Sequence, residues 1–221
     1  MIATNTGFGR LQFILLLVLW GSATPLWAGD LSVSVIDDQG ELVENAVVVL
    51  HPLFDDDWST LEPQALLMKQ QGAMFRPFVL AVGTASTVSF PNLDEFRHQV
   101  YSYSKAKRIE LRLYGMDESK TVLFDRAGIV ALGCNIHDNM LAYIYVSDEP
   151  YHVVSDAQGM ALIRDVRPGD YEMTIWHPDQ KKRRQSYMQS LSVLADSAAV
   201  AARIEMRSSR RQQKSPASAG Y

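Results

Sequence analysis

Four side chains of the kinds that bind soft and borderline metal ions lie in two segments of this chain. The first segment, residues 133–140, has the spacing Cys-x2-His-x2-Met in Cys134, His137 and Met140. An apolar run precedes this segment and another follows it, which places the three side chains on a loop between two strands. His98 lies 36 positions before the cysteine, at the start of a further apolar run.

These residue types together favour copper. A thiolate is a strongly donating soft ligand, two imidazoles suit both oxidation states of copper, and a thioether is a weak axial ligand. Such a set accepts Cu(I) and Cu(II) with little rearrangement, which suits electron transfer. We therefore expect His98, Cys134, His137 and Met140 to bind one copper ion, and we expect no catalytic residues.

The chain has a single cysteine, so it cannot form an internal disulfide. The alternative interpretation of Cys134 is a small, inert core residue, and Met140 and His137 also have structural alternatives as core and loop residues. A Cys–His hydrolase is a further alternative, but no third orienting group can be identified and Met140 would then have no role. The other three histidines are interpreted as structural or surface residues: His51, His152 and His177.

The segments around these residues are typical of an all-β protein. Short β-branched and aromatic runs recur between turn residues, which predicts a sandwich. The predicted strands of this part are 78–82, 87–90, 98–103, 108–113, 121–124, 129–132 and 141–146. Upstream, residues 31–35 and 46–50 around the turn at 37–40 predict a hairpin, and residues 61–71 could hold a helical turn. Downstream, strands are predicted at 160–163 and 171–176, with two more ending near residue 206.

Residues 74–148 resemble a cupredoxin, the class of plastocyanin and azurin. The matching motifs are 88–92 (Val-Ser-Phe-Pro-Asn), His98-Gln99-Val100, and the strand from Gly128 to Cys134 followed by the ligand loop. The resemblance is closest to bacterial exported cupredoxins called methylamine-utilisation proteins, which read H-H-V-Y-S and C-N-I-H-D-W-M; here Gln99 and Asn139 depart from that pattern. The resemblance implies a Greek-key sandwich, the four copper ligands above, and a Gln99 amide that points at the Cys134 sulfur.

Residues 37–50 and 153–206 resemble two parts of a carboxypeptidase-regulatory-like, transthyretin-like sandwich. The motifs are Ser-Asp-x-x-Gly at 155–159 and Pro-Gly-x-Tyr at 168–171. We therefore expect a flanking sandwich at 31–58 plus 149–206, interrupted by a cupredoxin domain at 70–148. The alternative is two edge extensions of one large sandwich.

The N-terminal residues are typical of an export signal. Arg10 precedes an apolar run over residues 11–20, which is shorter than the roughly 20 residues that span a bilayer. Cleavage after Ala28 would remove residues 1–28, release the chain into the periplasm and leave no stable membrane span; an uncleaved anchor is the alternative. The formal net charge of −4 argues against nucleic acid as the main partner. The basic residues 207–221 are expected to be a disordered tail.

The sequence thus predicts a periplasmic copper protein that transfers single electrons to and from a redox-protein partner. Two alternatives belong to other classes of function. One is copper handling or sensing without redox cycling, and the other is a binding module for a partner or polysaccharide in which the metal is structural.

Overall fold

The computed structural model describes residues 29–56, 58, 65–181, 187–194 and 198–208. Within them the chain forms strands and no helix, so the predicted all-β class is confirmed. None of the described residues forms a helix of the length and apolarity needed to cross a membrane. The strands are β1 Gly29–Asp37, β2 Val47–Pro52, β3 Ala65–Leu67, β4 Lys69–Gln70, β5 Phe75–Arg76, β6 Val79–Gly83, β7 Ser86–Pro91, β8 His98–Tyr103, β9 Arg108–Tyr114, β10 Ser119–Phe124, β11 Gly128–Gly133, β12 Leu141–Ser147, β13 Tyr151–Val154, β14 Met160–Val166, β15 Gly169–Trp176, β16 Tyr187–Val193 and β17 Ala198–Ile204.

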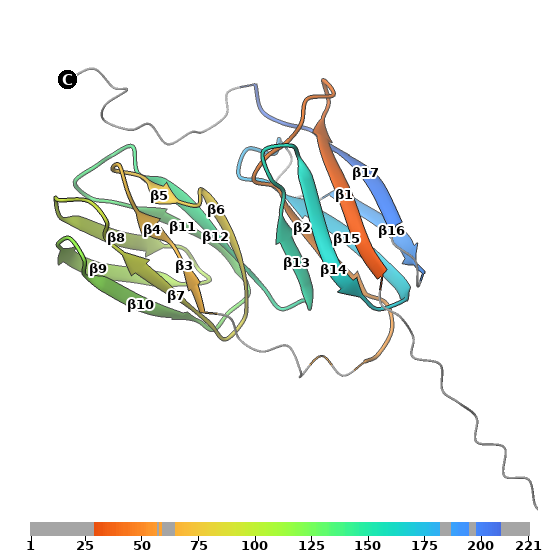
Figure 1. The fold of residues 1–221 in the computed structure, drawn as a ribbon, viewed down its shortest axis with the longest axis horizontal. Coiled ribbons are helices and arrows are strands. Elements are labelled where there is room, and N and C mark those ends of the chain that lie inside the picture. The colour runs from red at the N-terminus through yellow and green to blue at the C-terminus, as the bar shows by residue number, and fades with distance from the viewer. Residues whose placement is uncertain (1–28, 57, 59–64, 182–186, 195–197, 209–221) are drawn as a thin grey trace, which may run out of the picture.

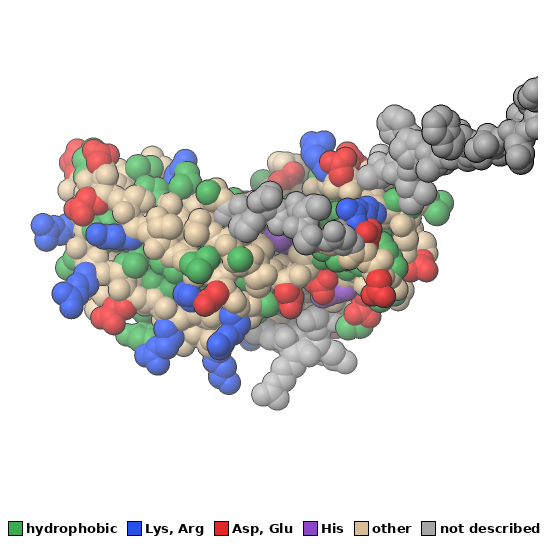
Figure 2. Space-filling model, turned by 90° about the horizontal axis from the view of Figure 1, so that it is seen from below, with side chains coloured by type: hydrophobic (Ala, Val, Ile, Leu, Met, Phe, Trp, Pro, Cys, Tyr) green, Lys and Arg blue, Asp and Glu red, His purple; other side chains and the backbone are tan. Residues whose placement is uncertain are grey.

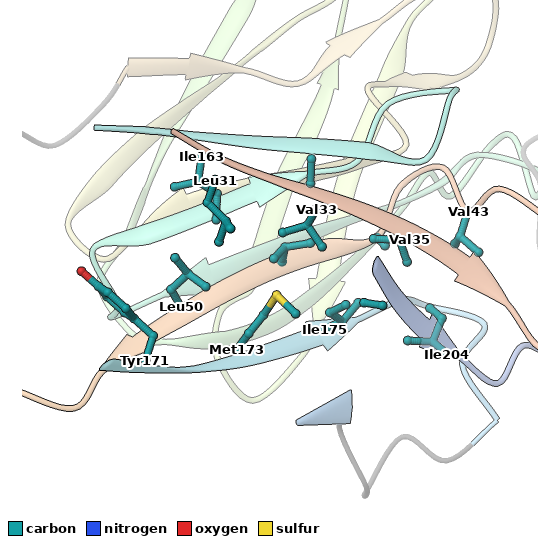
Figure 3. Close-up of a cluster of buried hydrophobic side chains, with 14 of the residues drawn as sticks. Leu31, Val33, Val35, Val43, Leu50, Ile163, Tyr171, Met173, Ile175 and Ile204 are labelled. Carbon is teal, nitrogen blue, oxygen red and sulfur yellow. The ribbon is translucent and has the colours of Figure 1, made fainter. Parts of the chain in front are cut away.

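Strands from both ends of the described chain share two sheets, which we call the flanking sandwich (Figure 1). The sheet orders are β14-β1-β17 and β13-β2-β15-β16. Alternate residues of β1 are buried, beginning with Leu31, Val33 and Val35, because successive side chains of a strand point to opposite faces. Figure 3 shows these side chains meeting Leu50 and Met173 from the facing sheet, and together they form one apolar core.

The predicted hairpin between β1 and β2 is wrong, because the two strands lie in different sheets. Strand β1 pairs with β14 and β17, whereas β2 pairs with β13 and β15. The sequence contains an indication of this, because Val47 to Leu50 are four consecutive apolar residues, and in the structure all four are buried. Val48 and Leu50 face the flanking core, and Val47 and Val49 face the other half of the molecule. Both faces of β2 are therefore covered, and its pairing with β13 on one side and β15 on the other places it inside its sheet.

Strands β3 to β12 form the second half of the molecule, which we call the central sandwich (Figure 1). Its sheets have the orders β10-β7-β3 and β6-β12-β11-β8-β9, with β4 and β5 as a separate hairpin. The helical turn considered for residues 61–71 is wrong over its described part, which forms β3 and β4. Leu66, Met68 and Gln70 turn inward while Leu67 and Lys69 are exposed, a period of two that suits a strand.

The two sandwiches contact each other through a small apolar cluster. Tyr143 of β12 lies with its ring centroid 5.8 Å from that of Trp176 at the end of β15. Val47 and Val49 of β2 and Val79 of β6 complete the buried part of this cluster. The contact packs the β12 side of the central sandwich against the flanking sandwich.

Candidate metal centre

His98 is the first residue of β8 and is fully buried. It pairs with Tyr114 of β9, and the register shifts by one residue before Val100, which is the mark of a β-bulge. Its Nε2 lies 2.8 Å from Oδ2 of Asp94. The other ring nitrogen, Nδ1, lies 3.9 Å from Sγ of Cys134. The ring is therefore held through one nitrogen and presents the other to the sulfur.

Asp94 contacts the His98 ring and is not among the candidate residues predicted from the sequence. Its carboxylate accepts hydrogen bonds from the amides of Gly72 at 2.7 Å and Ala73 at 3.0 Å, in the turn between β4 and β5. Burial raises the pKa of this carboxyl, but the two amides and the His98 ring outweigh burial and lower it overall. An ionised carboxylate in this place fixes the histidine tautomer, as carboxylates do beside many metal-bound histidines. The sequence offered one indication of this contact, which is that Asp94 lies four positions before the candidate ligand His98.

Cys134 and His137 lie on the loop that follows β11. Cys134 is 3% exposed, and its Sγ is 3.7 Å from Nδ1 of His137. The carbonyl of His137 accepts the amide of Met140 at 3.0 Å, which closes a tight turn in the loop. One donor atom from each of His98, Cys134 and His137 lies within 4.8 Å of the others. Among the described residues, no other three His, Cys, Asp or Glu side chains come together in this way.

The surroundings of Cys134 favour the thiolate. Burial raises the pKa of the thiol, but hydrogen bonds to the sulfur outweigh burial and lower the pKa to about 6. The donors are the His98 ring, the amides of Gln99 and Ile136, and the His137 ring. The Gln99 amide is the donor that the cupredoxin resemblance implied. A thiolate is the form of cysteine that binds metals.

Met140 is buried in the same apolar cluster as Cys134, at the end of the loop and directly before β12. Its assignment as an axial ligand stays a prediction. The aromatic ring of Phe96 stands beside the two histidines, 5.0 Å from His98 and 5.2 Å from His137 between ring centroids. His137 is half-buried, so the solvent-facing side of the centre is at this histidine.

The remaining histidines make other bonds. His51 contacts Glu149 through Nδ1 and Thr174 through Nε2, both at 2.8 Å. His152 bonds the Glu149 carbonyl at 3.0 Å, and Nδ1 of His177 accepts the Asp179 amide at 3.0 Å. These contacts agree with the structural roles expected for them.

The donor set of one thiolate and two imidazole nitrogens fits copper. The two histidines present Nδ1 rather than Nε2, and in His98 the contact to Asp94 leaves only Nδ1 available. The three donor atoms lie within 4.8 Å of one another, and the contact to Asp94 holds the His98 ring in place.

No known protein-family model and no curated protein matches this sequence. Solved structures similar to part of it include the copper-containing nitrite reductase from Thermus scotoductus SA-01, which is 25% identical over 44% of this chain, with a TM-score of 0.37. The match spans only 25% of the reductase. A purple cupredoxin from Nitrosopumilus maritimus is 18% identical over 38% of this chain and 100% of its own, with a TM-score of 0.34. A mutant of amicyanin in the Cu(I) form is 14% identical over 45% of this chain and 98% of its own, with a TM-score of 0.36.

Proposed function

We propose that this chain is an exported copper protein that exchanges single electrons with redox partners. The observation that carries the proposal is the convergence of Cys134 Sγ with Nδ1 of His98 and Nδ1 of His137 at 3.9 and 3.7 Å. A buried thiolate between two imidazoles is a donor set that suits both Cu(I) and Cu(II). The proposal assigns no catalytic residue.

In this proposal His98, Cys134, His137 and Met140 would hold one copper ion, and the Met140 thioether would be the weakest of the four donors. The bound ion supplies a centre that gains or loses one electron. The protein would limit rearrangement at the site, because Asp94 fixes the His98 ring and the amides of Gln99 and Ile136 favour the thiolate. Burial of three of the four residues keeps water away from all but the His137 side.

The proposal extends to domains and location. Residues 70–148 are the copper-binding domain, and residues 31–58 plus 149–206 are a sandwich that supports it or offers a docking surface. Residues 1–28 are an export signal that directs the chain to the periplasm, and residues 207–221 are a basic tail; both lie outside the described residues except for Arg207 and Ser208.

The test is copper titration of the mature chain, followed by visible absorption. We expect one equivalent of Cu(II) to produce an intense thiolate-to-copper band, and Cys134→Ser to abolish it. His51→Gln is the matched control, because His51 binds Glu149 and Thr174 instead and its loss should leave the band unchanged. A chain that binds Zn²⁺ in place of copper, or a band that survives in Cys134→Ser, would contradict the proposal. Midpoint potential and electron self-exchange rate then separate electron transfer from copper storage.

A further inference from the structure

The described residues cover only half of one face of the central sandwich. On the outer face of the sheet β6-β12-β11-β8-β9, Tyr143 and Ala131 pack against the flanking sandwich. The β8 and β9 side of the same face is open, and there Tyr101 and Tyr103 stand two residues apart on one strand. Tyr103 is 75% exposed, the highest value among the large hydrophobic residues described. Exposed tyrosines of this kind are enriched at protein interfaces.

The open face is in direct contact with the backbone beside the metal centre. Tyr101 pairs with Gly133, the residue peptide-bonded to Cys134. A Cβ atom at Gly133 would lie 2.7 Å from Cζ and from Oη of Tyr101, so the ring lies across this glycine and only glycine fits beneath it. The Tyr101 and Tyr103 ring centroids are 5.4 Å apart. A short path of packed groups therefore leads from the cysteine to the surface at Tyr103.

The surface around this path is basic. The guanidinium carbon of Arg108 lies 5.6 Å from the centroid of the Tyr103 ring. The same β8–β9 hairpin carries three more cations, Lys105, Lys107 and Arg112, against one acid, Glu110. Lys107 also forms an ion pair with Asp125 at 2.8 Å. Figure 2 shows both Lys or Arg and Asp or Glu side chains at the end of the molecule that holds the central sandwich, so the excess of cations is local to this hairpin.

We infer that the open face formed by Tyr101, Tyr103 and Arg108 docks an acidic one-electron redox protein. The inference rests on the proposed function and names a partner class for it. One electron leaves the Cu(I)-loaded chain across this face and reduces the acidic partner, with no proton transferred; the reverse reaction uses the same contacts. The charge complementarity favours an acidic partner, and the tyrosine path favours one that exchanges electrons.

The first test measures binding without any electron transfer. The full mature chain, with Cu(I) and without copper, is titrated with hexacyanochromate(III), a paramagnetic anion, while amide NMR signals are recorded. We expect selective broadening at Tyr103 and Arg108, no such broadening by the hexaamminechromium(III) cation, and loss of the effect in Arg108→Glu. Arg203→Glu, an exposed charge reversal on β17, is the matched control and should leave the broadening intact. Broadening centred elsewhere overturns the inference.

The second test measures the rate at which ferricyanide oxidises the Cu(I) form. Arg108→Glu should slow the reaction roughly threefold at low ionic strength, and salt should remove the difference. Tyr103→Leu should slow it with an unchanged midpoint potential. Oxidation rates that neither substitution changes would overturn the inference. So would a sulfated dextran that binds this face with the same affinity in Tyr103→Leu as in the unchanged protein, because that result would indicate a site for polyanions. Failure to bind copper would defeat the proposed function while leaving the anion-binding test readable.

Discussion

The two sandwiches use their buried polar side chains in different ways. In the flanking sandwich such side chains satisfy the backbone: Ser155 Oγ accepts the Ala46 amide at 2.9 Å and donates to the Val43 carbonyl at 2.7 Å. In the central sandwich Asn92 does the same for the Phe96 and Tyr114 carbonyls, at 2.9 and 3.1 Å, but His98 contacts two other side chains, Asp94 and Cys134. Among the described residues, a cluster of potential metal donors therefore occurs only in the central sandwich.

The two cores show the same contrast. Both cores contain methionine, Met173 and Met206 in the flanking core and Met68 and Met140 in the central core, but the single cysteine, Cys134, lies in the central core. A sandwich core needs only apolar side chains of suitable volume. We propose that the Cys134 thiol of the central core serves metal binding, and that the flanking core serves packing alone. Four substitutions test this contrast, in order of expected effect.

The largest effect is expected from Tyr171→Ala in the flanking core. Tyr171 is fully buried, contacts Phe54 at 5.4 Å between ring centroids, and donates to the Arg167 carbonyl at 2.6 Å. Removing the ring should cost about 3–5 kcal/mol of unfolding free energy, measured by urea denaturation. The copper band of the folded fraction should be unchanged. Tyr103→Ala, at an exposed position, is the control and should change the free energy by less than about 0.5 kcal/mol. An altered copper spectrum in Tyr171→Ala would show that the flanking core shapes the centre.

Ser155→Ala tests the hydrogen bonds between a buried side chain and the backbone in the flanking sandwich. The change leaves a buried amide and a buried carbonyl without a partner, so we expect a loss of about 1–3 kcal/mol in urea denaturation. Copper affinity should not change. Ser190→Ala, an exposed serine of β16, is the control. A loss no larger than that of the control would mean that water replaces the hydroxyl.

Asp94→Ala tests the side-chain network of the central sandwich. Without the carboxylate the His98 ring can turn and change tautomer, so copper affinity should fall by about 10–100-fold in a competition titration. Glu95→Ala, which removes the neighbouring exposed acid, should leave the affinity unchanged. Equal effects in the two variants would mean that the carboxylate acts only through net charge.

The smallest change in stability is expected from Met140→Leu, because the two side chains have similar volume; the loss should be under about 1.5 kcal/mol. Copper should stay bound and its midpoint potential should rise, since a thioether donates density to Cu(II) more than to Cu(I). Redox titration measures the shift. Met188→Leu, at a residue that is 61% exposed, is the control. An unchanged potential in Met140→Leu would remove Met140 from the ligand set.

Much of the local structure could be predicted because it depends on neighbours in the chain. The alternation of Leu31, Val33 and Val35 predicted a half-buried strand, and the strand is β1. Sheet partners could not be predicted in the same way, since pairing joins residues far apart in sequence. The error at β1 and β2 is of this kind: both strands were identified correctly, but their partners, β17 and β15, lie more than a hundred residues away.

For the candidate centre, the chemistry of the loop could be predicted from the sequence. Cys134, His137 and Met140 lie within seven residues, so their proximity follows from chain connectivity. The other contacts of the centre depend on how distant segments pack together. Pairing across sheet and loops brought His98 to the sulfur, and the turn between β4 and β5 held Asp94 so that one ring nitrogen faces inward. The pairing of β8 with β11 also places the Tyr101 ring over Gly133. These contacts join distant segments, and local periodicity specifies which face a side chain occupies but not which strand lies opposite.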